Sequence, residues 1–296
     1  MALFDAPLLF DGGLGTHLEA LGYDISGPLW SARVLRENPA LIESAHADFF
    51  AAGAQIATTA SYQITFDVLG GEAESLLRRS VTVARDAARK AGDRHAAHGD
   101  LMVAASIGPY GAGPGRGNEY DGAYGLSAHE LRRWHARRVE VLADTEADFL
   151  LAETIPNVDE AAVLLELLSA QPKPFALSIT GAIAADPTKL SQVIALANQI
   201  PLLGAVGVNC VRPPQAWAAV KALRAGTDKP LLACPNSGEI WDRGARDWRP
   251  APAGAMGLTE AAAEMRVAGV GLLGGCCRVG PAEIRQLRRS IRFEDK

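Results

Sequence analysis

The sequence predicts an α/β protein with a single (β/α)8 TIM barrel that comprises residues 1–296 as one domain. Short apolar runs alternate with helical patterns along the whole chain and form eight strand-then-helix units. The strands are almost continuously apolar, as expected for parallel strands that are buried on both faces. No change in composition and no linker marks a second domain. A doubly wound open sheet is the alternative, but it rarely has eight regular units without an N-terminal phosphate-binding loop.

The first four units fill the N-terminal half of the chain. Gly53 ends the first long helical segment, and Pro109 stops the third strand. Ser127 and Glu130 have the spacing of a capping box, which predicts the start of a helix. The predicted strands are residues 8–10, 55–61, 101–107 and 149–154. The first predicted helical segment follows Thr16 and runs through Asn38-Pro39 to residue 52, and the next helices are residues 72–97, 127–143 and 156–168.

The last four units repeat the pattern to the C-terminus. The predicted strands are residues 174–180, 205–210, 230–236 and 270–273, and the predicted helices are residues 188–199, 213–223, 259–267 and 281–289. A segment rich in Trp, Arg and Pro between residues 236 and 259 is predicted to be a loop. The glycine-rich stretch 110–125 is the longest irregular one, and loops of that length inside a compact domain usually serve function.

Charge and composition exclude several classes of partner. The formal net charge is −5 and no basic patch stands out, which argues against a nucleic-acid surface. Residues 2–9 lack the basic region of a cleavable signal, and no apolar run is long enough to span a bilayer. Four cysteines in a chain of this size do not form a disulfide framework. We therefore expect a cytoplasmic protein without nucleic-acid or membrane partners; its oligomeric state stays open.

Arginine and histidine residues are expected to lie mostly at the surface. The cluster Arg132, Arg133, Arg137 and Arg138 has helical spacing, which predicts a solvated helix face. His17 lies near the barrel rim on the first helical turn and is expected to cap a helix or face solvent. His46 is expected to pack in the core, and His95, His98, His129 and His135 to lie on the surface.

Two adjacent cysteines follow the eighth predicted strand. In a regular strand the side chains of Cys276 and Cys277 would point to opposite faces, so the strand must end there and the backbone must turn. Gly274 and Gly275 are expected to make this turn, because glycine adopts positive φ without steric strain. Adjacent cysteines at a strand end indicate either a metal site or a vicinal disulfide.

A third cysteine favours the metal site. Cys210 ends the sixth predicted strand, and the ends of parallel strands meet on one rim of a barrel. Three thiolates suit Zn²⁺ and leave the fourth tetrahedral position open for a substrate. A redox pair and inert buried thiols are the alternatives, and Cys234, inside the seventh strand, is expected to be a core thiol.

Other polar residues end strands on the same rim. They are Asp11, Thr58, Thr59, Tyr62, Glu153, Asn209 and Asn236. Each alone could simply terminate a strand, but together they favour a binding site at the C-terminal ends of the strands. Asp11 and Glu153 offer carboxylates to an amine, and the N–H groups of Gly12, Gly13 and Leu14 suit a carboxylate. With a metal that binds a thiolate, this rim is complementary to an amino acid that carries a thiol.

Short motifs along nearly the whole chain resemble those of one enzyme family. They include Asp11-Gly12-Gly13, Leu29-Trp30-Ser31-Ala32, Thr58-Thr59-Ala60-Ser61-Tyr62, Ile107-Gly108-Pro109-Tyr110-Gly111, Glu153-Thr154-Ile155-Pro156, Gly207-Val208-Asn209-Cys210, Pro235-Asn236-Ser237-Gly238-Glu239 and Gly274-Gly275-Cys276-Cys277-Arg278. In these motifs the chain resembles the zinc-dependent homocysteine S-methyltransferases. The resemblance implies Zn²⁺ on Cys210, Cys276 and Cys277, and homocysteine held by Asp11, the following glycine amides and Glu153.

The predicted function is methyl transfer from a sulfonium donor to the thiol of L-homocysteine, giving methionine. The resemblance favours S-methylmethionine as the donor, with S-adenosylmethionine second. A cationic donor predicts an aromatic wall, for which Trp30, Tyr62, Tyr110 and Tyr120 are candidates, and Glu119 is a candidate acceptor for the donor's amino group. Thr59 and Asn209 complete the predicted substrate contacts. A betaine-dependent enzyme and a barrel that binds zinc or thiols without turnover are the alternatives.

Overall fold

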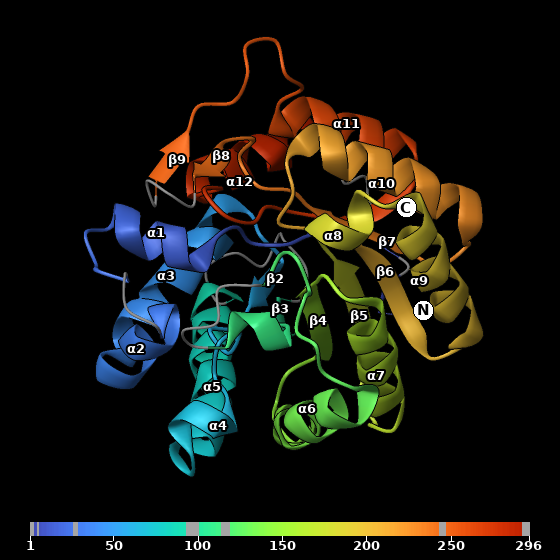
Figure 1. Cartoon of the computed structure of the whole chain (residues 1–296). Coiled ribbons are helices and arrows are strands. Elements are labelled where there is room, and N and C mark those ends of the chain that lie inside the picture. Colours follow the sequence, from blue (N-terminus) through green and yellow to red (C-terminus); the bar gives the residue numbers. More distant parts are fainter. Residues whose placement is uncertain are drawn as a thin grey trace.

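The computed structural model describes residues 3–4, 6–25, 29–92, 101–113, 119–242 and 247–291, and its centre is a parallel eight-stranded sheet (Figure 1). The strand order is β1-β10-β7-β6-β5-β4-β3-β2. The strands are β1 (Leu8–Leu9), β2 (Ile56–Thr58), β3 (Met102–Ile107), β4 (Phe149–Ile155), β5 (Phe175–Ile179), β6 (Leu203–Asn209), β7 (Leu231–Cys234) and β10 (Val270–Leu273).

The sheet closes on itself between its first and last strands. Phe10 forms a parallel bridge with Ile56, and the Gln55 N–H donates to the Leu9 carbonyl at 2.7 Å. The Asp11 N–H donates to the Ile56 carbonyl at 2.9 Å. These bonds join β1 to β2 and confirm the predicted (β/α)8 barrel.

Helices surround the strands, as Figure 1 shows. They are α1 (Leu14–Ala20), α2 (Trp30–Glu37), α3 (Pro39–Ala52), α4 (Phe66–Leu69), α5 (Glu72–Gly92), α6 (Ala128–Ala143), α7 (Val158–Ser169), α8 (Gly181–Ala184), α9 (Pro187–Gln199), α10 (Pro213–Gly226), α11 (Leu258–Val267) and α12 (Pro281–Ser290). The capping box at Ser127 is confirmed, since its N–H donates to the Glu130 carboxylate at 2.9 Å. The predicted end of the α5 helix at residue 97 lies outside the described residues. In the described part of the chain, every helix is too short or too polar to cross a membrane.

The loop prediction between residues 236 and 259 is wrong in part. This segment contains an antiparallel hairpin of β8 (Ile240–Asp242) and β9 (Asp247–Arg249), in which Trp241 pairs with Trp248. The strands are only three residues long, so their alternation gives a weak signal in the sequence.

Two apolar layers lie on the two faces of the barrel sheet. The inner cluster contains residues of all eight barrel strands, among them Phe10, Phe149, Leu232 and Leu272. The outer cluster joins the sheet to the helices. Cys234 belongs to the inner cluster and is 7% exposed, so the prediction of a buried core thiol is confirmed.

The prediction of a solvated face on α6 is wrong for two residues. His135 and Arg138 are buried, at 0% and 1% exposure. They lie four and seven residues after the buried Leu131, so helical periodicity places them on the core-facing side of α6. His46, on α3, is buried as expected.

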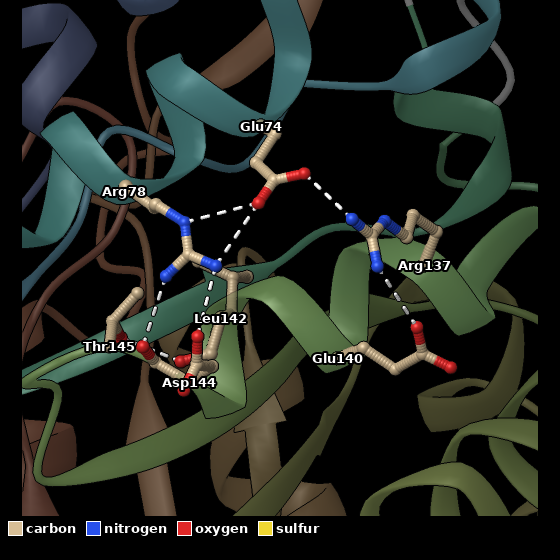
Figure 2. Close-up of polar contacts among 7 residues, drawn as sticks. All are labelled: Glu74, Arg78, Arg137, Glu140, Leu142, Asp144 and Thr145. Atoms are coloured by element: carbon tan, nitrogen blue, oxygen red, sulfur yellow. Dashed lines mark hydrogen bonds and ion pairs between the residues drawn. The ribbon is translucent and has the colours of Figure 1, made fainter. Parts of the chain in front are cut away.

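The exposed side of α6 carries ion pairs instead, which Figure 2 shows. Arg137 donates to Glu74 of α5 at 2.7 Å and lies 3.6 Å from Glu140. Arg78 lies 3.1 Å from Glu74 and 3.0 Å from Asp144. Exposed pairs of this kind typically contribute less than about 1 kcal/mol each. They join α5 to α6 at the surface, and the buried charges of α6 call for a different explanation.

Candidate metal and substrate site

Three of the four cysteines come together at one end of the barrel. Cys210 follows β6, and Cys276 and Cys277 follow β10. Their Sγ atoms all lie within 4.8 Å of one another, and those of Cys210 and Cys277 are 3.5 Å apart. Sulfurs that ligate one ion through bonds of about 2.3 Å lie about 3.8 Å apart in a tetrahedral site. The cluster therefore has the spacing of a three-thiolate metal site.

The end of β7 holds both cysteine segments, because β7 lies between β6 and β10 in the sheet. The Cys210 N–H donates to the carbonyl of Cys234 at 3.1 Å, and the Cys276 N–H donates to the carbonyl of Pro235 at 2.8 Å. Cys210 has a φ of 55°, a left-handed conformation that few residues other than glycine adopt. The backbone, and not the sulfurs themselves, thus fixes the separation of the thiols.

The explanation predicted for Gly274 and Gly275 is wrong, because neither has a positive φ. Both are glycines because other chain segments approach them closely. A Cβ atom at Gly274 would lie 2.5 Å from Cβ of Phe10, and one at Gly275 would lie 2.2 Å from Cγ1 of Val279. The left-handed residue of this turn is Arg278, with a φ of 63°.

Arg278 is held from two sides. Its Nε and Nη2 donate to the Glu239 carboxylate at 2.7 and 3.0 Å, and its N–H donates to the Thr16 hydroxyl at 3.0 Å. The Ser237 hydroxyl donates to the same carboxylate at 2.9 Å. A bidentate pair is geometrically specific, so it fixes the residue that directly follows the two cysteines. From the sequence, Ser237, Glu239 and Arg278 were identified only as members of short motifs, and no role was assigned to them.

Without a metal, the three thiols are linked by hydrogen bonds. Hydrogen bonds from Cys276 and Cys277 hold the pKa of Cys210 well below its usual range. The bonds to Cys210 in turn raise the pKa of Cys276 and of Cys277. The Tyr120 hydroxyl lies 3.5 Å from the Cys210 sulfur. A divalent cation would favour ionisation of all three thiols and suits this set of ligands.

Two carboxylates lie on the same rim, the buried Asp11 and the half-buried Glu153. Asp11 is 2% exposed, and its oxygens accept hydrogen bonds from the Thr58 N–H at 2.7 Å and the Thr58 hydroxyl at 2.8 Å. Burial, with a smaller effect of the charge on Glu153, raises the pKa of Asp11 to about 8. Burial also raises the pKa of Glu153 to about 7, against the effect of a hydrogen bond from Ser106. Two carboxylates destabilised in this way favour a cation between them.

Asn209 and Thr59 hold other residues of the site in place. The Asn209 oxygen accepts hydrogen bonds from the Thr154 N–H and the Ser178 hydroxyl, both at 2.8 Å. Its nitrogen donates to the Thr154 hydroxyl at 2.7 Å and to Glu153 at 3.3 Å. The Thr59 hydroxyl is bonded to Ser61 and to the Ser106 N–H. Both were predicted as substrate contacts, and the structure engages their polar atoms within the protein.

Ser106 and Ser178 were missed as site residues. Each is a buried polar residue inside an otherwise apolar strand, β3 or β5. That exception to the apolar pattern is the signal by which the sequence could have indicated them, because a buried hydroxyl needs a partner.

Gly12 and Gly13 allow the segment after β1 to approach closely the segment after β10. A Cβ atom at Gly12 would lie 2.1 Å from the Val279 carbonyl oxygen, and one at Gly13 would lie 2.7 Å from that of Cys276. The Gly13 N–H donates to the Val279 carbonyl at 2.9 Å. The N–H of Gly13 is therefore engaged by the turn that carries the cysteine pair, residues 274–279, which is called the cysteine turn below. The prediction that this N–H is offered to a substrate carboxylate is wrong.

Of the predicted donor contacts, the structure brings Tyr62 and Tyr120 to the thiols. Burial and the nearby charges of Cys210, Glu153 and Glu119 raise the pKa of Tyr62, so this ring lies among those groups. Tyr120 contacts Cys210 directly. Trp30 begins α2 with 38% of its surface exposed, and it is not enclosed as these tyrosines are.

Comparison with known proteins gives consistent matches over nearly the whole chain. The profile of the family described as homocysteine S-methyltransferase matches residues 8–291. The chain is 40% identical to a homocysteine S-methyltransferase of Escherichia coli over 291 residues, which cover 95% of this chain and 94% of that protein. It is also 40% identical to homocysteine S-methyltransferase 4 of Zea mays, over 95% of this chain and 88% of that protein.

Among solved structures, the chain is similar to the metallated form of the homocysteine methyltransferase MmuM from Escherichia coli. The two have a TM-score of 0.85 and 37% sequence identity, and the match covers 97% of each chain.

The close packing of the cysteine turn can be tested at Gly275. Gly275→Ala should lower the free energy of unfolding by about 1–3 kcal/mol, the range for overpacking, because the new Cβ would lie 2.2 Å from Val279. Gly271→Ala, in the same segment, is the matched control, since a Cβ there meets nothing within 4 Å. Urea denaturation measures both; equal stability of the two variants would contradict the packing argument.

Proposed function

The chain belongs to the homocysteine S-methyltransferase family, and we propose that it transfers a methyl group from S-methylmethionine to the thiol of L-homocysteine. The two products are both methionine. The proposal is supported above all by one observation: a cluster of three thiols shares a barrel rim with two carboxylates, Asp11 and Glu153, whose pKa values are raised by desolvation.

The metal of this proposal is Zn²⁺ on Cys210, Cys276 and Cys277. The sulfur spacing suits one ion, thiolates are ligands that zinc prefers, and three protein ligands leave a position for a substrate. When bound, zinc would keep the homocysteine sulfur deprotonated at neutral pH, whereas a free thiol with a pKa of about 8.5 is mostly protonated.

Asp11 and Glu153 are assigned to the ammonium group of homocysteine. Both carboxylates have raised pKa values through burial, so a cation that replaces the lost solvation is favoured between them. Asn209 positions Glu153 and lies 4.0 Å from the Cys276 sulfur, which links the amino-acid end to the thiol end. The N–H groups of Gly12 and Leu14 are assigned to the substrate carboxylate, because that of Gly13 donates to Val279.

Tyr62 and Tyr120 are assigned to the wall beside the donor sulfonium. An aromatic face attracts a cation with about 0.5–2 kcal/mol. In the reaction the S–CH3 bond of the sulfonium breaks as a new bond forms between that carbon and the homocysteine sulfur. The thiol proton has already gone to solvent, and a cation and a thiolate become two neutral thioethers. No general acid is needed, and the site residues serve to orient the two substrates.

The first prediction concerns the metal. Cys210→Ala, Cys276→Ala and Cys277→Ala should each lose stoichiometric zinc and methyl transfer, because each removes one of three ligands. Cys234→Ala is the control and should keep both, since its thiol lies in the inner barrel cluster. Elemental analysis after dialysis measures zinc; one zinc per chain retained in all three ligand variants would refute the assignment.

The second prediction concerns Glu153. Glu153→Gln should raise KM for homocysteine about 10- to 150-fold, which corresponds to about 1.5–3 kcal/mol for a hydrogen bond to a charged group. Zinc content should stay unchanged. Glu166→Gln, at an exposed ion pair with Arg132, is the control. An unchanged KM for homocysteine in Glu153→Gln would remove this residue from the substrate site.

The donor is tested with zinc-loaded protein and saturating homocysteine. Initial rates with S-methylmethionine should exceed those with S-adenosylmethionine, and betaine should be slowest. Faster turnover with betaine would overturn the choice of donor but leave the acceptor site intact. No methionine from any of the three donors would favour a barrel that binds zinc or thiols without turnover.

A further inference from the structure

A buried group of three polar side chains lies away from the thiols, between α6 and α7. Glu160, His135 and Arg138 are at most 1% exposed. Nε2 of His135 lies 2.8 Å from Oε1 of Glu160, and Nη2 of Arg138 lies 3.0 Å from Nδ1 of His135. A guanidinium can only donate, so Nδ1 accepts and Nε2 carries the proton that His135 donates to Glu160. The imidazole is neutral, in accord with the effect of burial, which lowers its pKa.

This buried group holds both ends of the turn that follows β3. Arg138 donates to the carbonyl of Gly108, and Glu160 accepts a hydrogen bond from the Tyr110 N–H at 2.6 Å. The guanidinium also lies over the Trp134 ring, 4.6 Å from its centroid, and that ring packs on Tyr110 with centroids 5.1 Å apart. The turn is thus fixed by charged side chains at each end and by an aromatic contact on Tyr110.

The start of α7, where Glu160 lies, also holds the far end of the loop that begins at Tyr110. The side chain of Asn157 accepts a hydrogen bond from the Glu160 N–H at 3.0 Å and donates to the carbonyl of Gly122 at 2.9 Å. The segment that begins at Tyr110 and the segment around Gly122 are therefore both anchored to the start of α7.

The Gly108–Tyr110 turn also fixes the position of Tyr62. A Cβ atom at Gly108 would lie 2.6 Å from the Tyr62 carbonyl oxygen and 2.7 Å from its ring, so the Gly108 backbone packs directly against that ring. Tyr62 also bonds to Thr154, beside Glu153, and feels the charge of Cys210. Contacts therefore run without a gap from Arg138 through Gly108 to the aromatic wall beside the thiols.

Two buried charged residues, Arg138 and Glu160 with His135 between them, are a costly way to join two helices. Desolvation of each ion costs several kcal/mol, and apolar residues of similar volume often do the same at least as well. On the outer side of α6, Arg137 makes its ion pairs in solvent instead. Unlike an apolar contact, the buried polar group makes directional hydrogen bonds to two backbone groups of the turn, the Gly108 carbonyl and the Tyr110 N–H.

We propose that Glu160, His135 and Arg138 form a positioning group that fixes the Gly108–Tyr110 turn, and through it the Tyr62 ring, for the cationic methyl donor; this inference rests on the function proposed above. The three residues touch neither substrate. Their effect should fall on the donor and spare the acceptor, because Asp11 is held by Thr58 and the thiols by the end of β7.

Arg138→Met tests the proposal, with Arg137→Met as the matched control on the exposed side of the same helix (Figure 2). In Arg138→Met, KM for S-methylmethionine should rise at least tenfold, while KM for homocysteine and the zinc content stay within twofold of the wild type. Arg137→Met should change none of these. A donor KM within twofold of the wild type, or an equal rise in both KM values, would overturn the proposal.

Arg138→Lys covers the case in which Arg138→Met does not fold. Lysine keeps the positive charge but loses the planar guanidinium, whose Nη2 contacts both Gly108 and His135 and which lies over the Trp134 ring. The donor KM should then rise at least threefold, again without a change in the homocysteine KM. An unchanged donor KM in a folded Arg138→Lys would equally contradict the proposal.

A readout without turnover separates this proposal from the proposed function. The chain has five tyrosines, so 19F spectra of protein labelled with 3-fluorotyrosine are simple, and Tyr62→Phe assigns the resonance of Tyr62. Arg138→Met, or Arg138→Lys if that variant alone folds, should shift this resonance, and Arg137→Met should not. An unmoved Tyr62 resonance overturns the positioning role. A shifted resonance in a protein that uses no S-methylmethionine would support the positioning of Tyr62 and refute the donor.

Discussion

The close approach of three sulfur atoms is the constraint on which the rest of the site depends. Without a cation, hydrogen bonds link the three thiols and lower the pKa of Cys210, whereas a bound metal would make all three of them thiolates, which repel one another within 4.8 Å. The backbone must therefore hold the sulfurs at the spacing that a metal needs. It does so through hydrogen bonds to the end of β7, a left-handed Cys210, the glycines around the cysteine turn and the clamp between Arg278 and Glu239. The cluster is thereby organised before a metal binds.

Different strands of the barrel carry different parts of the site around this cluster. In the proposed function, β1 and β4 bring carboxylates for the amino-acid end of the acceptor, and β6 joins Glu153 to the thiols through Asn209. The segments after β2 and β3 bring Tyr62 and the turn that packs on it. The contacts that hold the Gly108–Tyr110 turn differ from those that hold Asp11 and the thiols, which is why substitutions behind the turn should spare the proposed acceptor site.

The sequence predicted the barrel and the thiol cluster well because both follow from short-range signals. Apolar strands can be located one by one, and parallel strands in a barrel all end on the same rim, so Cys210 and the Cys276–Cys277 pair had to meet. Roles that depend on distant contacts could not be found in this way. Position 275 must be glycine because Val279 packs on its Cα, and the hydroxyl of Thr59 is occupied by hydrogen bonds with Ser61 and Ser106. Arg138 was assigned to the surface from its charge, although its spacing from Leu131 places it on the buried side of α6.

The central claim is that three cysteine thiolates hold a zinc ion that then binds the homocysteine sulfur. X-ray absorption at the zinc K-edge of the loaded protein measures this most directly, with and without homocysteine. The account predicts three sulfur ligands and one lighter ligand at about 2.0–2.3 Å in the free protein, and four sulfur ligands after homocysteine is added. A sulfur count below three in the free protein, or one that does not rise with homocysteine, would contradict it.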